Sequence, residues 1–332
     1  MVTSPPRRIF WSGARNLTHV VYAASWLRAQ LADDSPAITL VAMDHGNCPS
    51  RTGLNASDII SLLPTHPSLH LASVDEVGLR ADRSEILTYL AVGAPGIKPW
   101  LRLKREHKTR RIDVVATDEG IGSYGTWQTR QAAYLRQGGR RGWSSIRAVA
   151  VDSASSVLTT ERWPLYLRTE SGWSLNTAVA DEFRRATRQR HNRRAIFLPQ
   201  PWVEMGVLDG SCYHRHVQQI ARASSEAGFQ FAVRPHPAEN SARYEEWDVL
   251  AGSTPAELDP RVTSASVVIG ATSTALVNLA SIFAIPALRL VTPGMEHLEQ
   301  GLSTGQASLL DAFVPELVDE ITLRDALSAK LR

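Results

Sequence analysis

Cysteine is nearly absent from this sequence: Cys48 and Cys212 are the only two among 332 residues, and they lie far apart in the chain. A disulfide framework and a cysteine-based zinc or iron–sulfur site are therefore excluded, and the composition fits a reducing compartment. The sequence also lacks Asp-x-Asp, His-Glu-x-x-His and any Cys/His cluster, so it predicts no metal site.

A long uninterrupted hydrophobic run is also missing. Polar and basic side chains such as Arg15 and Asn16 break the apolar stretch within the first 30 residues, which therefore lack the core of a signal peptide. The most apolar segment, residues 264–291, contains several Ser and Thr residues and Pro286, which favours buried strands and a helix over a membrane span. We expect a cytoplasmic protein.

The net charge is small, at +3, but it is unevenly distributed. Residues 1–194 hold 27 basic and 17 acidic side chains, whereas residues 195–332 hold 9 basic and 16 acidic ones. The length corresponds to about two domains of roughly 150 residues each. We therefore predict an N-terminal domain over residues 1–190 and a C-terminal domain over residues 191–332, with different partners.

Strand-like and helix-like segments alternate along the whole chain. Strands are predicted at residues 7–13, 37–44, 69–75, 111–118, 194–202, 229–237, 265–270 and 286–291. Helices are predicted at residues 17–31, 55–63, 83–93, 129–136, 211–227, from Ser273 and near the C-terminus, with a charged linking segment at 181–194. This alternation predicts an α/β protein with two doubly wound, Rossmann-like parallel sheets. Such sheets bind ligands at the carboxyl ends of their strands, so we expect the domains to face a central cleft that holds the site.

Asp118, Glu119 and Gly120 directly follow a predicted strand. A carboxylate at a strand end, beside a glycine that lets another molecule approach closely, suits a general base. A simple strand-ending turn explains the same residues. Gly120 also begins a Gly-x-Gly-x-x-Gly pattern, but no acidic residue lies between Glu119 and Asp152, so dinucleotide binding is not predicted.

His236 and Pro237 end a predicted strand in the second half, after Arg234 and Pro235. The prolines on both sides of the histidine restrict its backbone. A protonated His236 could neutralise a phosphate, with Arg234 adding a second positive charge. The alternative is a histidine that merely occupies a proline-rich turn.

Thr272, Ser273 and Thr274 join a buried strand to a helix. Hydroxyl side chains in this position usually cap the helix. The N–H groups at the same helix start also form a site for an anion. The sequence contains no Gly-x₄-Gly-Lys-Ser/Thr motif, so a P-loop is not predicted.

Two basic tracts stand out. Residues 98–111 contain seven Lys and Arg side chains around Trp100, and residues 184–194 contain six. Both a solvated surface and an attraction for polyanions or an anionic membrane fit these tracts. No fold signature of a nucleic-acid-binding protein accompanies them, so nucleic acid is not an expected partner.

In order and spacing, Asp118-Glu119-Gly120, His236-Pro237 and Ser273-Thr274 resemble the motifs of bacterial sialyltransferases with the GT-B fold, nearest to the polysialyltransferase-like family. Residues 196–201, which include Gln200, resemble the strand that opens the donor domain of that family. The resemblance implies two Rossmann-like domains and an inverting, metal-independent transfer of sialic acid, with a CMP-sugar as co-substrate and no cofactor.

The resemblance also implies roles for single residues. Glu119 would deprotonate the acceptor hydroxyl, His236 would bind and protonate the departing CMP phosphate, and Ser273 and Thr274 would hold that phosphate. The implied partners are the CMP-sugar and a glycan or glycolipid acceptor, anionic in character, with peripheral association at the inner membrane. Thr274 departs from the family, which carries a second serine there.

Three alternatives remain open. A CDP-alditol glycerophosphotransferase of the teichoic-acid type uses similar His-Pro and paired hydroxyl motifs, and a UDP-sugar 2-epimerase shares the fold. A module that binds polyanions is the non-enzymatic alternative. The motifs do not distinguish sialic acid from other sugars carried on CMP, nor single transfer from polymerisation.

Overall fold

The computed structural model describes residues 5–31, 35–43, 54–136, 138–187 and 192–330. By its internal contacts the chain divides into two units. Unit 1 comprises Met1–Ser123, Arg140–Leu167 and Ser174–Glu182, and unit 2 comprises Tyr124–Gly139, Arg168–Trp173 and Phe183–Arg332. The domain boundary predicted between residues 190 and 191, and part of the basic tract at 184–194, lie outside the described residues.

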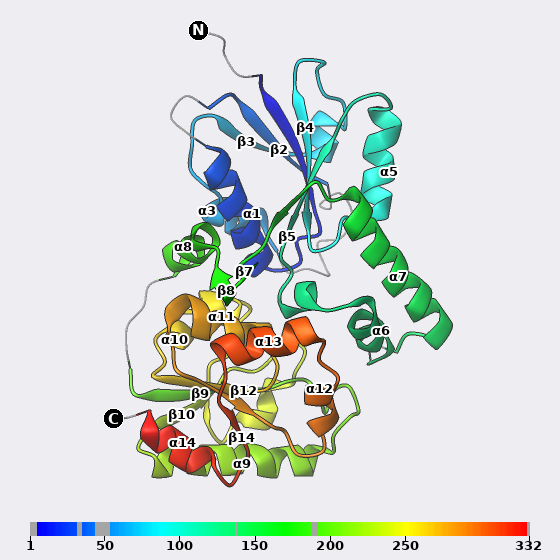
Figure 1. Ribbon diagram of the computed structural model, residues 1–332. Coiled ribbons are helices and arrows are strands. Elements are labelled where there is room, and N and C mark those ends of the chain that lie inside the picture. The colour runs from blue at the N-terminus through cyan, green and yellow to red at the C-terminus, as the bar shows by residue number, and fades with distance from the viewer. Residues whose placement is uncertain (1–4, 32–34, 44–53, 137, 188–191, 331–332) are drawn as a thin grey trace. The chain divides into compact units, whose positions relative to one another are not determined.

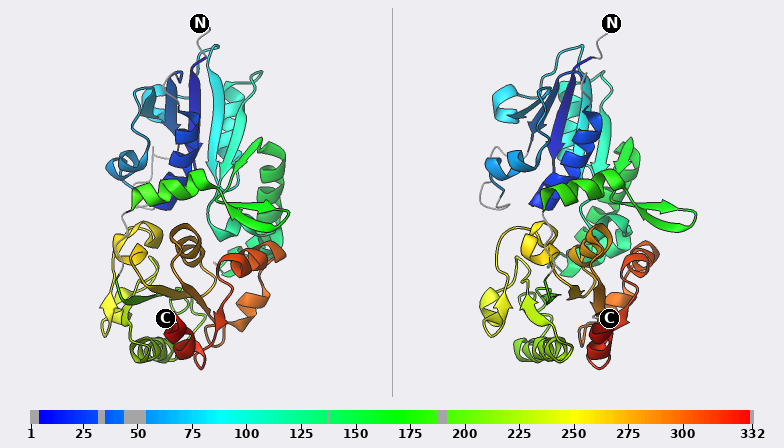
Figure 2. Two further views of the ribbon diagram at one scale, coloured as in Figure 1. Left: turned by 60° about the vertical axis from the view of Figure 1, so that its left-hand side comes forward. Right: turned by 90° about the vertical axis from the view of Figure 1, so that its left-hand side faces the viewer.

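Unit 1 contains a six-stranded sheet in which every paired strand is parallel (Figures 1 and 2). Its strands are β1 (Arg7–Ser12), β2 (Ile38–Ala42), β3 (Leu69–Ser73), β4 (Ile86–Val92), β5 (Asp113–Thr117) and β6 (Glu161–Trp163), in the order β3-β2-β1-β4-β5-β6. The direction of winding reverses between β1 and β4, which is where doubly wound sheets bind ligands.

Helices cover both faces of this sheet. Its helices are α1 (Leu17–Gln30), α3 (Ala56–Leu62), α4 (Val74–Val77), α5 (Ile97–Glu106) and α7 (Arg141–Leu158). One apolar core contains side chains of α1 and α3, such as Val20 and Ile59, and the other contains Leu103 of α5. A two-stranded sheet pairs β7 (Tyr166–Thr169) with β8 (Gly172–Leu175), and α8 (Thr177–Ala186) follows.

Unit 2 repeats the architecture with a second six-stranded parallel sheet (Figure 2). Its strands are β9 (Arg194–Leu198), β10 (Gln230–Val233), β11 (Asp248–Val249), β12 (Val267–Gly270), β13 (Ala287–Leu290) and β14 (Leu317–Val318), in the order β11-β10-β9-β12-β13-β14. Its helices are α6 (Trp127–Arg136), α9 (Gly210–Glu226), α10 (Pro260–Thr263), α11 (Thr274–Phe283), α12 (Glu296–Gln300), α13 (Thr304–Phe313) and α14 (Leu323–Ala329).

The helix predicted at residues 83–93 is wrong, because this segment contains the central strand β4. From Leu87 to Val92 every residue is buried, since the strand lies inside the sheet with both faces covered. A short run of apolar residues without alternation fits a buried strand or a buried helix equally well. The segment predicted at 111–118 as the fourth strand is consequently the fifth, β5.

The sequence did not predict helices α5 and α7 of unit 1. Helix α5 overlaps the basic tract at 98–111, and α7 follows a Gly/Arg-rich segment. In α7 the buried residues are Ser144 and Ala148, so the usual apolar stripe facing a core is missing. Among the described residues, no helix combines the length and apolar character needed to cross a membrane.

Candidate functional site

The carboxyl edge of the sheet in unit 1 gathers three glycine-containing strand ends. Gly13 follows β1, Gly93 follows β4, and Gly120 lies shortly after β5. Because β1, β4 and β5 are neighbours and parallel, these strand ends lie side by side where the winding reverses. The predicted Asp118-Glu119-Gly120 motif therefore lies at the ligand-binding edge of this sheet.

Asp118 and Glu119 have different environments. Asp118 is buried, and its Oδ2 accepts a hydrogen bond from the backbone N–H of Leu165 at 2.7 Å. This carboxylate therefore holds the connection between β6 and β7 and is turned away from solvent. Glu119 is exposed, and its backbone N–H donates to Ser123 Oγ at 3.1 Å. Of the two carboxylates, Glu119 is the one that another molecule can reach.

Two glycines permit the position of Glu119. Gly120 has a φ of +118°, a conformation that side-chain-bearing residues rarely adopt, and it lets the chain turn directly after the carboxylate. A Cβ atom added to Gly93 would lie 2.5 Å from Glu119 Oε2, so a larger residue there would force this carboxylate to shift. Sequence reasoning missed Gly93 because the preceding strand was interpreted as a helix.

A buried histidine supports the same loop. His19 lies in the first turn of α1, and its ring is hydrogen-bonded to the backbone of Glu119 and Gly13. Its Nδ1 accepts the backbone N–H of Arg15 at 3.1 Å. Burial, aided by the charge of Arg15, lowers the pKa of His19 to about 4, so the ring is neutral near pH 7. His19 thus fixes the backbone that carries Glu119.

Unit 2 gathers the other predicted residues at the carboxyl edge of its own sheet. Gln200 follows β9, His236 follows β10, and Thr272 follows β12. The order β10-β9-β12 makes these three strands direct neighbours, and all their pairings are parallel. Gln200 Nε2 donates to the carbonyl of Pro199 at 3.2 Å, and Pro237 is exposed.

His236 is half-buried and held in one orientation. Its Nδ1 accepts the backbone N–H of Ala238 at 3.1 Å, so in the neutral ring the proton lies on Nε2, which can donate to a ligand. Its backbone N–H donates to Glu239 Oε2 at 2.7 Å. Burial lowers the pKa of His236, although the charge of Glu204 opposes this shift. In the free protein the ring is therefore neutral near pH 7, and an approaching phosphate would favour its protonation.

Glu239 and Tyr244 stabilise the turn and were missed by sequence reasoning. The phenol of Tyr244 donates to Glu239 Oε1 at 2.7 Å, so one carboxylate joins the backbone of His236 to a buried tyrosine. Burial raises the pKa of Glu239. The available signal was an acidic residue three positions after His236, in a segment that already looked like a turn.

Ser273 caps α11. Its Oγ accepts the backbone N–H of Leu276 at 3.1 Å, which is the structural role that hydroxyl residues commonly have there. This bond occupies an acceptor site of the hydroxyl, whose hydrogen can still be donated to an anion. Thr274 is the first residue of the helix, and Thr272 precedes the cap. Capping and anion binding are therefore compatible at this helix start.

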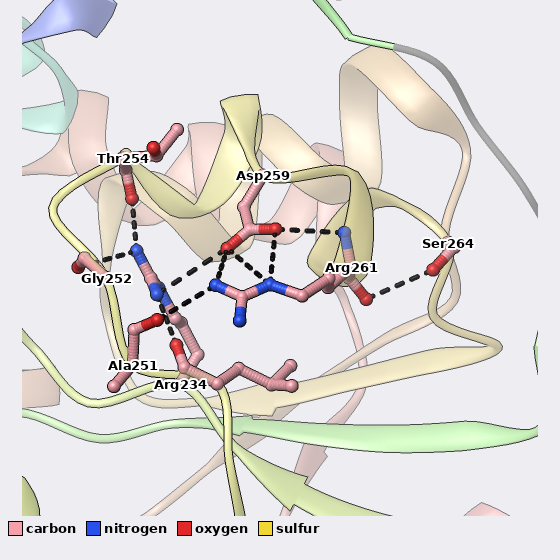
Figure 3. A network of polar contacts seen from close by, with 8 residues as sticks. Arg234, Ala251, Gly252, Thr254, Asp259, Arg261 and Ser264 are labelled. Atoms are coloured by element: carbon pink, nitrogen blue, oxygen red, sulfur yellow. Dashed lines mark hydrogen bonds and ion pairs between the residues drawn. The ribbon is translucent and has the colours of Figure 1, made fainter.

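The side chain of Arg234 is bonded to other groups of the protein itself (Figure 3). Its guanidinium is buried and donates to the carbonyls of Leu250, Gly252 and Thr254, and Asp259 Oδ2 lies 3.5 Å from its Nη1. Asp259 also pairs with Arg261 at 2.7 Å. Every terminal nitrogen of Arg234 thus has a partner from the loop that follows β11, so the side chain fits loop stabilisation better than phosphate binding.

We expect Arg234→Lys to destabilise the protein by about 2 kcal/mol or more. Lysine keeps the charge, but its single ammonium nitrogen cannot take the places of both Nη1 and Nη2, which together bond three carbonyls. The free energy of unfolding, measured by chemical denaturation, tests this. Arg222→Lys on the exposed face of α9 is the matched control and should leave the free energy of unfolding unchanged. If Arg234→Lys instead weakened nucleotide binding without loss of stability, the structural role would be wrong.

A Gly-x-Ser-x-Gly pattern at residues 301–305 has a capping role. Ser303 Oγ accepts the backbone N–H of Gln306 at 3.2 Å, and the side chain of Gln306 accepts the backbone N–H of Ser303 at 3.1 Å. The motif joins α12 to α13 and does not form the strand-to-helix turn of serine hydrolases. Within the described part of the chain, no three His, Cys, Asp or Glu side chains form a group that could hold a metal ion.

Comparisons with known proteins define the fold. No protein-family model and no curated protein sequence matches the chain. It is similar to the structure of a Listeria monocytogenes protein assigned as a UDP-N-acetylglucosamine 2-epimerase, with 10% identity, a TM-score of 0.53, and coverage of 97% of this chain and 90% of that one. Together with the two parallel sheets, this likeness decides the architecture. The chain has the GT-B fold.

The comparisons also find two likenesses with TM-scores below 0.5. One is to the E. coli heptosyltransferase WaaC with ADP-2-deoxy-2-fluoro heptose, at 13% identity and a TM-score of 0.42, covering 86% of this chain and 89% of that one. The other is to a sialyltransferase from Photobacterium damsela, at 10% identity and a TM-score of 0.46, covering 95% and 81%.

Proposed function

We propose that this protein is an inverting, metal-independent glycosyltransferase that moves sialic acid, or a related nonulosonic acid, from a CMP-sugar to a hydroxyl group of a glycan or glycolipid. The observation that carries the proposal is the placement of two kinds of group at the carboxyl edges of the two sheets: a candidate general base in unit 1 and candidate phosphate-binding groups in unit 2. A reachable carboxylate, Glu119, ends a strand of unit 1, and an oriented His236 with a capped helix start ends strands of unit 2.

In the proposed reaction Glu119 accepts the proton of the acceptor hydroxyl while that oxygen attacks the anomeric carbon of the sugar. The bond between the anomeric carbon and the phosphate oxygen breaks, and the electron pair leaves with CMP. Attack from the side opposite the phosphate inverts the anomeric centre. Removing the carboxylate charge should therefore slow the chemical step more than substrate binding.

In this proposal, residues of unit 2 stabilise the leaving phosphate. His236 donates a hydrogen bond from Nε2 to the phosphate as negative charge develops on it, while its Nδ1 keeps the bond from the Ala238 N–H. The hydroxyls of Ser273 and Thr274, together with N–H groups in the first turn of α11, donate to the same phosphate, and Thr272 and Gln200 line the approach. In this proposal Arg234 stabilises the loop that follows β11 and does not bind the phosphate.

A UDP-sugar 2-epimerase is the second candidate, because the likeness with a TM-score of 0.53 is to a protein assigned that activity. The two candidates differ in the nucleotide that they bind. A CDP-alditol glycerophosphotransferase would differ again, since its donor carries a second phosphate and no sugar ring at the reacting centre.

We expect CMP to raise the melting temperature of the protein more than UDP, GDP or CDP-glycerol at equal concentration. A ligand present at about 100 times its Kd stabilises the folded state by roughly 2.7 kcal/mol, enough for a clear thermal shift. A panel of the four nucleotides, read by differential scanning fluorimetry, measures this. A shift with UDP alone would favour the epimerase, and a shift with CDP-glycerol alone would favour the phosphotransferase.

A further inference from the structure

The outward face of α7 is unusually apolar. Trp143, Ile146, Val149 and Val157 have exposed fractions of 67%, 62%, 45% and 80%. At 1.5 Å per residue, the stripe from Trp143 to Val157 is about 21 Å long. Helical spacing brings these four side chains to one side of the helix.

The amphipathic pattern of α7 is reversed relative to that of an ordinary surface helix. The buried residues, Ser144 and Ala148, are small, whereas the large apolar side chains face outward. Normally the large apolar residues of a helix face the core and polar ones face water. A group of exposed apolar side chains of this kind marks a surface that binds another protein or a membrane.

The neighbouring helix α5 adds positive charge. Lys98, Arg102 and Arg105 recur on one side of α5 and are exposed, and Lys108 follows just beyond the helix. Within the part of the chain that the structure describes, none of these four is ion-paired with a carboxylate, unlike Arg111, which pairs with Asp113 at 2.7 Å. Ile97 and Leu101 are exposed on the same side of α5.

Topology brings α5 and α7 to the same face of the sheet in unit 1. The connections from β4 to β5 and from β5 to β6 run in the same direction across the sheet, so right-handed crossovers put both helices on one side. Figure 1 shows them on the side of this sheet opposite α1 and α3.

We infer that the outward faces of α5 and α7 form a membrane-binding surface for anionic lipids. Apolar side chains that include tryptophan, set beside unpaired cations on surface helices, are the features of helices that lie in the plane of the interface. Apolar burial and attraction to a negative headgroup layer then act together. The inference uses none of the residues assigned to catalysis and does not depend on the proposed activity.

Co-sedimentation with phospholipid vesicles tests the inference on the full-length protein. Vesicles of phosphatidylcholine mixed with phosphatidylglycerol should sediment the protein, whereas vesicles of phosphatidylcholine alone should sediment much less. Adding salt should weaken binding because it screens the exposed cations. Trp143→Ser with Ile146→Ser should lower the partition coefficient by about ten-fold or more, as should Arg102→Glu with Arg105→Glu.

Matched controls come from other surfaces. Ile60→Ser on α3, exposed on the opposite face of the same sheet, removes a comparable apolar side chain and should leave binding unchanged. Arg215→Glu with Arg222→Glu on α9 makes the same charge change in unit 2. Equal binding of the α7 variant and the Ile60 control would overturn the inference. A lipid-free dimer that dissociates in the α7 variant would also overturn it, since the face would then belong to a second copy.

Discussion

Replacing Glu119 by Gln is expected to lower the rate of sugar transfer by about a thousand-fold, the usual contribution of a positioned general base. Glutamine has nearly the same shape, so it fits beside Gly93, but it cannot accept the acceptor proton. The affinity for CMP and the melting temperature should stay near the wild-type values, because the residue is exposed. Single-turnover transfer rates and calorimetric binding constants separate the two effects.

Two further variants sharpen this result. Glu106→Gln removes another exposed carboxylate of unit 1, which lies 3.3 Å from Nε of the exposed Arg80. This variant should transfer at the wild-type rate. Gly93→Ala keeps Glu119 but puts a Cβ in the space of its carboxylate, so it should also slow transfer. Transfer by Glu119→Gln within a few-fold of the wild-type rate would show that another group is the base.

Replacing His236 by Asn is expected to reduce both transfer and nucleotide affinity. The amide oxygen of asparagine can still accept the Ala238 N–H, so the turn should survive, but the Nε2 donor is lost. A hydrogen bond to a charged group contributes roughly 1.5–3 kcal/mol, which corresponds to a loss of about ten-fold to a hundred-fold in CMP affinity. Isothermal titration calorimetry and circular dichroism measure affinity and folding respectively.

The same variant should change the pH dependence of nucleotide binding. The pKa of His236 in the free protein lies below its ordinary value because burial disfavours the charged ring. Bound phosphate favours that charge and raises the pKa, so binding takes up a proton between the two pKa values. The affinity for CMP should therefore rise as the pH falls through this window, by at most about ten-fold per pH unit, and level off below it.

Comparing the pH profiles of CMP binding by the wild type and by His236→Asn separates the contribution of His236 from the titration of the phosphate itself. CMP titrates identically with wild type and with His236→Asn, so the difference between their pH profiles reports the histidine. His214→Asn, which removes a partly exposed histidine from α9 of the same unit, should keep the wild-type profile. Parallel profiles for wild type and His236→Asn would mean that His236 does not bind the phosphate.

The alternation of strands and helices was sufficient to predict the fold class and to put the motif residues at strand ends. Strand ends such as those after β5, β10 and β12 carry strong local signals, because a run of mainly apolar residues stops at or near Asp, Pro or Gly. The order of the strands in a sheet depends on the tertiary structure and cannot be read from local sequence. The adjacency of β9, β10 and β12, which gathers Gln200, His236 and Thr272, therefore became visible only in the sheet order.

Side-chain environments could not be predicted in the same way. Arg234 looked like a phosphate ligand because it lies two residues before His236, yet the loop after β11 surrounds its guanidinium and supplies its hydrogen-bond acceptors. His19 gave no signal, since its contact with the backbone of Glu119 joins residues separated by 100 positions in sequence. Likewise, the exposed stripe of α7 obscured the helix, because pattern recognition assumes that apolar residues face inward.

The division of each unit into separate chain segments has a consequence for the construction of chimaeras. Tyr124–Gly139 and Arg168–Trp173 belong by their contacts to unit 2, although each is encoded before the main body of that unit. A chimaera made with one crossover near residue 190 would therefore join unit 2 of one parent to these two segments from the other. Exchange of the whole of unit 2 between two parents needs a transplant that carries α6 and residues 168–173 together with the C-terminal half. The segments to be exchanged are therefore discontinuous in the gene.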